Sequence, residues 1–125
     1  MKSDLREPCK SCPYRMDSPL LLWHRSEFQN LLANDADPLR GGQFACHQHR
    51  ERDPGERSYC VGWLLDQRRR YEPSIQHRLS LREAPALRQA MGEISDGGHE
   101  LYPSIEEMCA ANGVLPEDAR YKDDE

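Results

Sequence analysis

Long apolar stretches are missing from this sequence. No segment approaches the roughly 18 consecutive apolar residues of a membrane-spanning helix, and the first residues lack the apolar run of a secretory signal peptide. Hydrophobic residues make up only 37% of the 125 residues, whereas 31% are charged. We therefore expect a cytoplasmic protein of one domain with a small apolar core, because a short chain buries a smaller share of its surface than a long one.

Signatures of catalysis are missing as well. The chain contains no P-loop, GxGxxG, HExxH or GxSxG motif. A thioredoxin-like role for a CxxC pair needs alternating strands and helices, and the sequence shows no such alternation. Catalysis by a cysteine nucleophile needs a histidine that converges on it in space, which a sequence does not reveal. We expect a protein without enzymatic activity.

Cysteines, by contrast, are spaced as metal ligands are. Cys9 and Cys12 are separated by two residues, and Cys46 and Cys60 follow from distant segments. Such a pair can turn toward one centre while the later thiols complete a tetrahedron around a metal. Because the cytoplasm is reducing, we expect these thiols to be ligands and not halves of disulfides. A structural metal offsets a small core, since its binding free energy contributes to folding.

The sequence leaves alternatives open for the metal and for its ligands. Four thiolates suit zinc, our first assignment, and also a [4Fe–4S] cluster, which stays the alternative. His47 and His49 are candidates for a substitute ligand or for a hydrogen-bonding neighbour of the site. Adjacent Cys46 and His47 cannot easily both reach one small ion, so an all-cysteine site ranks above a mixed one.

Residues next to the cysteines are expected to cover this site. Tyr14 and Trp63 supply aromatic rings that exclude water, and Arg15 places a guanidinium near the thiolate charge. Cys60 directly precedes a predicted helix, whose free N-terminal amides favour an ionised sulfur. The fifth cysteine, Cys109, falls on the apolar face of another predicted helix, and we expect a buried, unreactive thiol there.

The remaining pattern predicts a mainly α-helical fold with four or so short helices and long loops. Helices are expected over residues 27–33, 61–71, 85–94 and 104–111, the first with a capping box at Ser26 and Gln29. Residues 73–83 are expected to form an irregular or short helical connection. We divide the chain into one metal-stabilised domain at 1–115, with a cysteine region at 8–65 and a helical part at 66–115, and an acidic tail at 116–125 that is expected to be disordered.

Charge is unevenly distributed along the chain. The net charge is -5, which argues against general nucleic-acid binding. Residues 40–82 nevertheless carry 9 basic and 5 acidic side chains, whereas residues 83–125 carry 3 and 11. Seven arginines of the middle region could contact phosphates: Arg50, Arg52, Arg57, Arg68, Arg69, Arg70 and Arg78. Nucleic-acid binding is therefore an alternative function.

Four motifs in a fixed order carry a resemblance to a known family. They are Pro8-Cys9-Lys10-Ser11-Cys12-Pro13-Tyr14-Arg15, Leu22-Trp23-His24 with Ser26-Glu27-Phe28, Phe44-Ala45-Cys46-His47-Gln48, and Cys60-Val61-Gly62-Trp63-Leu64. Together they resemble a family of small uncharacterised proteins from bacteria and their phages, over about residues 8–65. The resemblance implies that the four cysteines act together, and it brings no established activity. Residues 66–125 lie outside this match.

Two shorter segments carry a weaker resemblance to the WhiB-like iron–sulfur regulators. Cys12-Pro13-Tyr14-Arg15 is similar to a segment of their cluster site, and Gly62-Trp63 is similar to the glycine-aromatic motif that follows it. The cysteines of that family are packed more closely than those of this chain. The resemblance keeps an iron–sulfur redox sensor or regulator as an alternative function.

Our main expectation is a metal-binding protein that supports a protein-interaction or regulatory module. The four cysteines hold the metal, zinc first, and the separate basic middle region and acidic C-terminal region offer surfaces for a protein partner. No membrane partner is expected.

Overall fold

Helices dominate the structure, as predicted. The computed structural model describes residues 1–37, 42–49 and 51–121, and in His47 and Pro54 the backbone alone. This part of the chain contains α1 (Arg25–Ala36), α2 (Val61–Arg69), α3 (Ile75–Glu83), α4 (Pro85–Glu93) and α5 (Ile105–Ala111), with short 3₁₀ turns η1 (His47–His49), η2 (Pro54–Glu56) and η3 (Pro116–Asp118). None of the helices described there is long and apolar enough to cross a bilayer.

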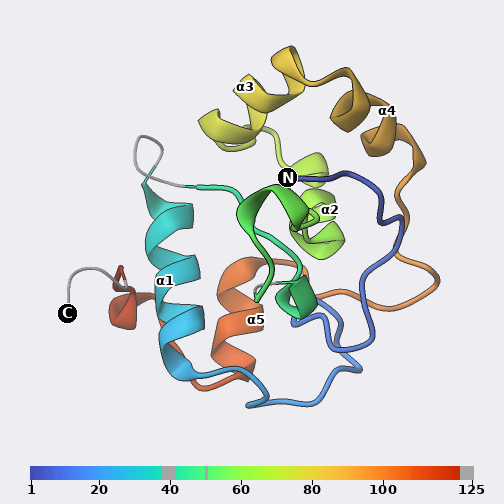
Figure 1. Cartoon of the computed structure of the whole chain (residues 1–125). Helices are drawn as coiled ribbons and strands as arrows, with labels where there is room; N and C mark the ends of the chain where they lie inside the picture. The colour runs from blue at the N-terminus through green and yellow to red at the C-terminus, as the bar shows by residue number, and fades with distance from the viewer. Residues whose placement is uncertain (38–41, 50, 122–125) are drawn as a thin grey trace.

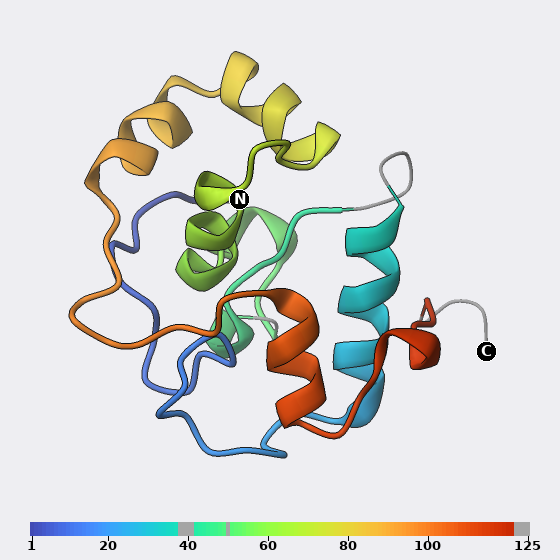
Figure 2. The same cartoon turned by 180° about the vertical axis from the view of Figure 1, so that it is seen from behind.

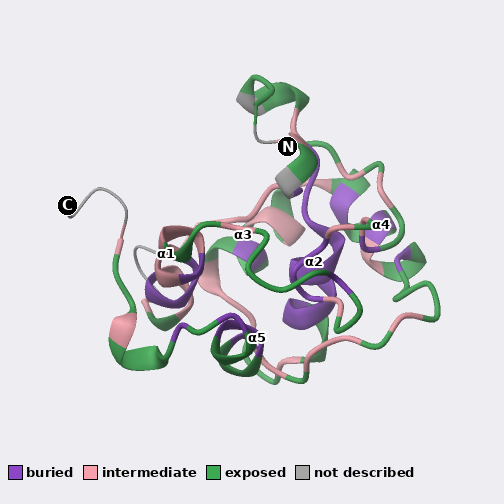
Figure 3. Ribbon diagram, turned by 90° about the horizontal axis from the view of Figure 1, so that it is seen from below, coloured by how far each residue is buried: buried purple, intermediate pink, exposed green. Residues whose placement is uncertain are grey.

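Helix α2 lies at the centre of the fold. Helices α1 and α5 lie side by side on one side of it, and the α3–α4 pair covers the other (Figures 1 and 2). All residues from Val61 to Gln67 are buried, so the first two turns of α2 are enclosed on every face (Figure 3). Trp63 and Leu64, each 1% exposed, contribute the largest side chains of this central layer.

The helices predicted over 61–71, 85–94 and 104–111 are present with small shifts of their ends. The connection at 73–83 is more regular than expected, because residues 75–83 form the nine-residue helix α3. Ser74 begins this helix: its hydroxyl accepts the backbone N–H of His77 at 3.2 Å. A serine cap satisfies one of the unpaired amides of the first turn.

Helix α1 is longer than predicted and begins differently. It runs over residues 25–36, not 27–33, and its N-cap is His24, whose Nδ1 accepts the backbone N–H of Ser26 at 3.0 Å. The predicted capping box of Ser26 and Gln29 is therefore wrong. An imidazole nitrogen performs here the role that a serine oxygen usually takes.

Residues 116–121 are ordered against α1, contrary to the disorder expected of the acidic tail. The backbone N–H of Arg120 donates to the carbonyl of Gln29 at 3.0 Å, and Arg25 forms an ion pair with Asp118 at 3.1 Å. Residues 122–125 lie outside the described part of the chain. A cation on α1 thus accounts for the ordering of an acidic segment that composition alone does not explain.

Two backbone pairings tie distant segments to the cysteine region. Lys2 pairs with the segment before Cys60, through Lys2 N–H to the carbonyl of Arg57 at 2.7 Å and Tyr59 N–H to the carbonyl of Lys2 at 2.9 Å. The segment before α5 pairs with the one after Cys12, where Tyr102 N–H donates to the carbonyl of Tyr14 at 3.0 Å. These pairings hold the cysteine segments from both sides.

Candidate metal centre

The first two cysteines occupy a tight turn. The backbone N–H of Cys12 donates to the carbonyl of Cys9 at 3.0 Å, and that of Arg15 donates to the carbonyl of Cys12 at 3.1 Å. Pro8 and Pro13, both buried, flank the turn with fixed φ angles. Two residues of spacing in such a turn bring both thiols toward the interior.

The other two cysteines lie on short paired segments. An antiparallel bridge joins Ala45 to Tyr59. Beside it, Cys46 N–H donates to the carbonyl of Ser58 at 2.8 Å, and Cys60 N–H donates to the carbonyl of Phe44 at 2.9 Å. The segment that carries Cys46 is therefore paired with the residues leading into α2. This pairing places Cys46 beside the start of the central helix.

The structure brings these four cysteines together, and we call Cys9, Cys12, Cys46 and Cys60 the four-cysteine cluster. Cys9 and Cys12, Cys9 and Cys46, and Cys12 and Cys60 lie close enough to shift each other's pKa. All are free thiols. Cys12, Cys46 and Cys60 are buried, and only Cys9 is partly exposed.

A backbone N–H two residues further along the chain lowers the pKa of each sulfur of the cluster. The donors are Ser11 for Cys9, Tyr14 for Cys12, Gln48 for Cys46 and Gly62 for Cys60, and Trp63 adds a second amide at Cys60. Amides directed at sulfur stabilise negative charge there. The same local geometry thus recurs four times in three separate segments, and at Cys60 the donors come from the N-terminus of α2, as predicted.

Hydrogen bonds between the thiols divide their protons unequally. The pKa of Cys9 is lowered by its hydrogen bonds with Cys12 and Cys46, and the pKa of Cys60 by its hydrogen bond with Cys12. The pKa of Cys12 is raised through its hydrogen bonds with Cys60 and Cys9, and that of Cys46 through its hydrogen bond with Cys9; burial reinforces both increases. The cluster therefore combines sulfurs that favour the thiolate with sulfurs that retain protons.

The thiols contact one another in a chain and do not form a closed shell. Within residues 1–37, 42–49 and 51–121, no group of three or more His, Cys, Asp or Glu side chains is arranged to hold a metal ion. The donor set itself, four sulfurs backed by amides, is that of a structural metal site.

Gly62 belongs to the sequence motif after Cys60, but no structural role was predicted for it. A Cβ placed there would lie 2.8 Å from Cys12 Sγ and 2.8 Å from both Cβ and Cδ2 of Tyr14. Real Cβ atoms do not approach other atoms so closely, so this position requires glycine. The available signal was a glycine inside a predicted helix, two residues after a cysteine.

The residues expected to cover the site surround it in different ways. Tyr14 is buried and packs against Gly62. Trp63 is buried between Phe44, at 5.7 Å between ring centroids, and His77, at 5.4 Å. Its ring therefore packs between two other rings in the core, and its role as a cover of the site stays a prediction.

Arg15 approaches the cluster through its guanidinium. Nη1 donates to the carbonyl of Cys9 at 3.4 Å, while Nη2 forms an ion pair with Asp17 at 2.7 Å. The pKa of Arg15 is raised mainly by its hydrogen bond with Asp17, with smaller contributions from the negative charge of Cys12 and Cys9. The guanidinium therefore lies beside the backbone of Cys9, and its role as a cover of the site stays a prediction.

Of the two candidate histidines, His49 has a described side chain. His49 is partly buried, and its Nδ1 accepts the backbone N–H of Ser58 at 3.3 Å, so this ring nitrogen stabilises the loop before Cys60. The side chain of His47 lies outside the described part of the structure.

Cys109 is separate from the cluster and chemically different. It is fully buried on α5, and its thiol donates to the carbonyl of Phe28 at 3.9 Å. Burial, reinforced by the charges of Glu106 and Asp35, raises its pKa to about 12. Cys109 is therefore a buried thiol on the apolar face of a helix, as predicted.

The three consecutive arginines of α2 make intramolecular contacts. Arg68 donates to the carbonyls of Met91 and Ile94 at 3.0 and 3.1 Å. Arg69 and Arg70 both pair with the buried Asp66 at 2.6 Å. Arg70 also pairs with Asp35 at 2.6 Å, which links α2 to α1. Arg50, another of the arginines considered for phosphate contact, lies outside the described residues.

Comparison with protein families gives one match. A family model described as a family of unknown function (DUF6283) matches residues 4–123. The match includes the helical part after residue 65, which the resemblance based on motifs had left outside. No curated protein and no solved structure matches the chain.

Proposed function

The chain belongs to the DUF6283 family of unknown function, and we propose that it is a small metal-binding protein whose four-cysteine cluster holds one structural zinc ion. Such an ion ties the N-terminal turn, the loop before α2 and α2 itself into one unit. The protein would act without catalysis, in the reducing cytoplasm, where thiols stay available as ligands.

One observation carries this proposal: the fold gathers four free thiols from three separate segments, three of them buried, beside backbone amides that lower their pKa values. The amides favour thiolates, whereas the neighbouring thiols and burial raise the pKa of Cys12 and Cys46. A divalent cation would replace the thiol protons and neutralise the charge. Cys109 donates its proton to a carbonyl and provides the contrast within the same chain.

The contacts between the sulfurs favour a single ion over a cluster. Sulfurs at the corners of a zinc tetrahedron lie about 3.8 Å apart, given a zinc–sulfur distance of about 2.3 Å. A [4Fe–4S] cluster inserts iron and sulfide between its ligands and needs wider separation. Thiols close enough to shift each other's pKa fit the narrower spacing of zinc ligands, and the iron–sulfur protein remains the alternative that the experiment below must distinguish.

Burial favours a structural role over a catalytic one. Cys12, Cys46 and Cys60 are 1%, 3% and 5% exposed. Catalytic zinc keeps an open position for water or substrate, whereas structural zinc is enclosed by four protein ligands. A structural ion also suits a chain with only 37% hydrophobic residues, because metal binding adds free energy that the small core lacks.

A loop beside the cysteine turn supports the interaction part of the proposal. Leu20, Leu21 and Leu22 are 54%, 73% and 50% exposed. Leu21 adopts a φ of 60°, and its N–H donates to the side-chain oxygen of Asn112 at 3.0 Å. A leucine held in a strained, exposed conformation loses stability, which a protein partner would recover by burying it.

Nucleic-acid binding is less well supported, because the described arginines of α2 already make intramolecular bonds. Arg69 and Arg70 are paired with carboxylates, and Arg68 is hydrogen-bonded to backbone carbonyls. A phosphate would have to compete with these bonds. The overall charge of -5 adds repulsion.

The proposal is tested by metal analysis of protein purified without air, comparing the wild type with Cys12→Ser and Cys109→Ser. We expect one zinc ion per chain in the wild type and in Cys109→Ser, and loss of zinc in Cys12→Ser. If the wild-type protein is coloured and contains iron and sulfide, the site holds an iron–sulfur cluster and not zinc. Absence of metal from all three proteins, or equal retention in both variants, would refute the site.

A further inference from the structure

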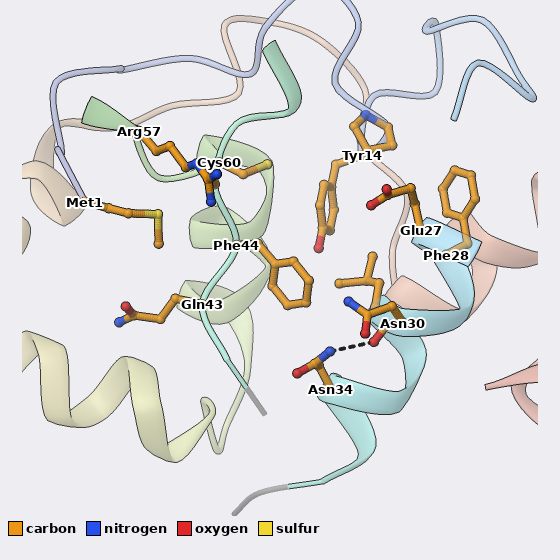
Figure 4. Close-up of a pocket in the computed structure, with 13 residues that line it drawn as sticks. Met1, Tyr14, Glu27, Phe28, Asn30, Asn34, Gln43, Phe44, Arg57 and Cys60 are labelled. Carbon is orange, nitrogen blue, oxygen red and sulfur yellow. Dashed lines mark hydrogen bonds between the residues drawn. The ribbon is translucent and has the colours of Figure 1, made fainter. Parts of the chain in front are cut away.

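A cavity of about 420 Å³ opens between α1 and the segment that leads to Cys46 (Figure 4). Its lining includes Tyr14, Phe28 and Leu31 on one side and Phe44 and Cys60 on the other. Small-molecule sites occupy volumes of roughly 300–1,000 Å³ and combine apolar walls with a few polar groups. The cavity is therefore large enough for a compact ligand.

The hydroxyl of Tyr14 is the polar group that sets the chemistry of this cavity. Its side chain is 3% exposed, and Oη has no hydrogen-bond partner in the described part of the chain. Figure 4 shows this hydroxyl pointing toward the space between Phe44 and α1. An unpaired buried hydroxyl costs about 1–3 kcal/mol, so a ligand that supplies a partner gains that free energy. A phenol donates one hydrogen, so the favoured partner is an acceptor.

Other polar groups of the lining already have partners. The Asn34 amide donates to the carbonyl of Asn30 at 2.8 Å, and the Gln43 side-chain oxygen accepts the hydroxyl of Tyr59 at 3.2 Å. The two charged residues of the lining, Glu27 and Arg57, have opposite signs. A neutral ligand therefore suits the lining better than an ion.

The walls select the shape of the ligand. Tyr14, Phe28 and Phe44 contribute three aromatic rings from three different segments. Aromatic rings prefer offset-stacked or edge-to-face contacts with other rings, each worth about 0.5–1.5 kcal/mol beyond the buried area. We propose that this cavity binds a small, neutral, planar aromatic compound whose hydrogen-bond acceptor meets the hydroxyl of Tyr14. The inference does not depend on a metal in the neighbouring cluster.

Three probes of similar size separate these requirements. Benzamide has a planar ring and a carbonyl acceptor, cyclohexanecarboxamide has the acceptor without the planar ring, and toluene has the ring without the acceptor. We expect titration of the full chain with benzamide to give saturable shifts in the NMR signals of α1 and residues 42–45. Its affinity should be at least about fivefold higher than that of either other probe. No saturable shift, or equal affinities for the three probes, would overturn the proposal.

Tyr14→Phe tests the hydroxyl directly, with Tyr71→Phe as a control at a side chain that is 99% exposed. In Tyr14→Phe the affinity for benzamide should fall about three- to tenfold, as expected for one hydrogen bond, and the affinity for toluene should be unchanged. Tyr71→Phe should bind all three probes as the wild type does. Because the Tyr14 hydroxyl has no partner to lose, Tyr14→Phe should melt at or above the wild-type temperature. A lower melting temperature, or unchanged benzamide affinity, would contradict the assignment.

Discussion

Gly62→Ala tests the packing of α2 against the cysteine turn. The added methyl would lie 2.8 Å from Cys12 Sγ and from two carbons of Tyr14, whereas carbon contacts are favourable at about 3.5–4.0 Å. Cys12 and Tyr14 are 1% and 3% exposed, so neither can move into solvent. The turn must therefore move away from α2 by several tenths of an ångström or more.

Two opposing terms set the size of the effect. Overpacking a buried site costs about 1–3 kcal/mol, while replacing glycine by alanine in a helix gains up to about 1 kcal/mol. The gain is small at this position, because Gly62 lies in the first turn of α2. We expect a net destabilisation of about 1–2 kcal/mol, which corresponds to a decrease of several degrees in melting temperature for a chain of this length.

Gly92→Ala provides a matched control. Gly92 lies in α4, and a Cβ built there meets no atom within 4 Å. The same substitution should therefore stabilise the protein by up to about 1 kcal/mol. Urea unfolding of the three proteins measures both changes. Competition with a zinc chelator measures the zinc affinity of the four-cysteine cluster. This affinity should be about tenfold or more lower in Gly62→Ala, because Cys12 Sγ is displaced. Equal stability and equal zinc affinity in Gly62→Ala and wild type would refute this account of the packing.

Three further predictions concern groups away from the cysteines. Burial lowers the pKa of His77 below 6.5, so between pH 7 and 5 the unfolded chain binds a proton that the folded chain excludes. The free energy of unfolding should therefore fall as the pH drops from 7 to 5. Urea titrations should show a weaker pH dependence for His77→Leu. Leu21→Gly should stabilise the chain by about 0.5–1 kcal/mol in thermal unfolding, because it relieves the left-handed conformation, and a loss of stability would contradict the strain. Arg70→Ala should lower the free energy of unfolding by about 2–3 kcal/mol in the same assay, because it removes the cation that neutralises Asp35 and the buried Asp66. The loss is smaller than for a fully buried ion pair. A change below about 0.5 kcal/mol would contradict a role for these bonds in stability.

Local sequence signals predicted those elements whose ends are determined nearby. The helices predicted to start at residues 85 and 104 begin within one residue of those positions, where Pro85 occupies the first turn of α4 and the Ser104 hydroxyl accepts the backbone N–H of Glu107. The CxxC spacing and the position of Cys60 before a helix are local patterns as well. These features depend on residues close together in the chain, which a sequence displays directly.

Features that depend on distant contacts could not be predicted in this way. His24 as the cap of α1 is an uncommon choice, and the ordering of residues 116–121 depends on a pairing with α1 that composition does not show. Gly62 is required by the approach of Cys12 and Tyr14, some fifty residues earlier in the chain. The cavity beside Cys60 is lined by residues from five separate segments, so no local sequence pattern predicts it.

X-ray absorption spectroscopy at the metal edge tests the central claim most directly, because it counts the atoms bound to the metal. On protein purified without air, the four-cysteine site predicts four sulfur neighbours at about 2.3 Å around one zinc ion. A first shell dominated by nitrogen or oxygen, or fewer than three sulfurs, would contradict the assignment of Cys9, Cys12, Cys46 and Cys60 as the ligands.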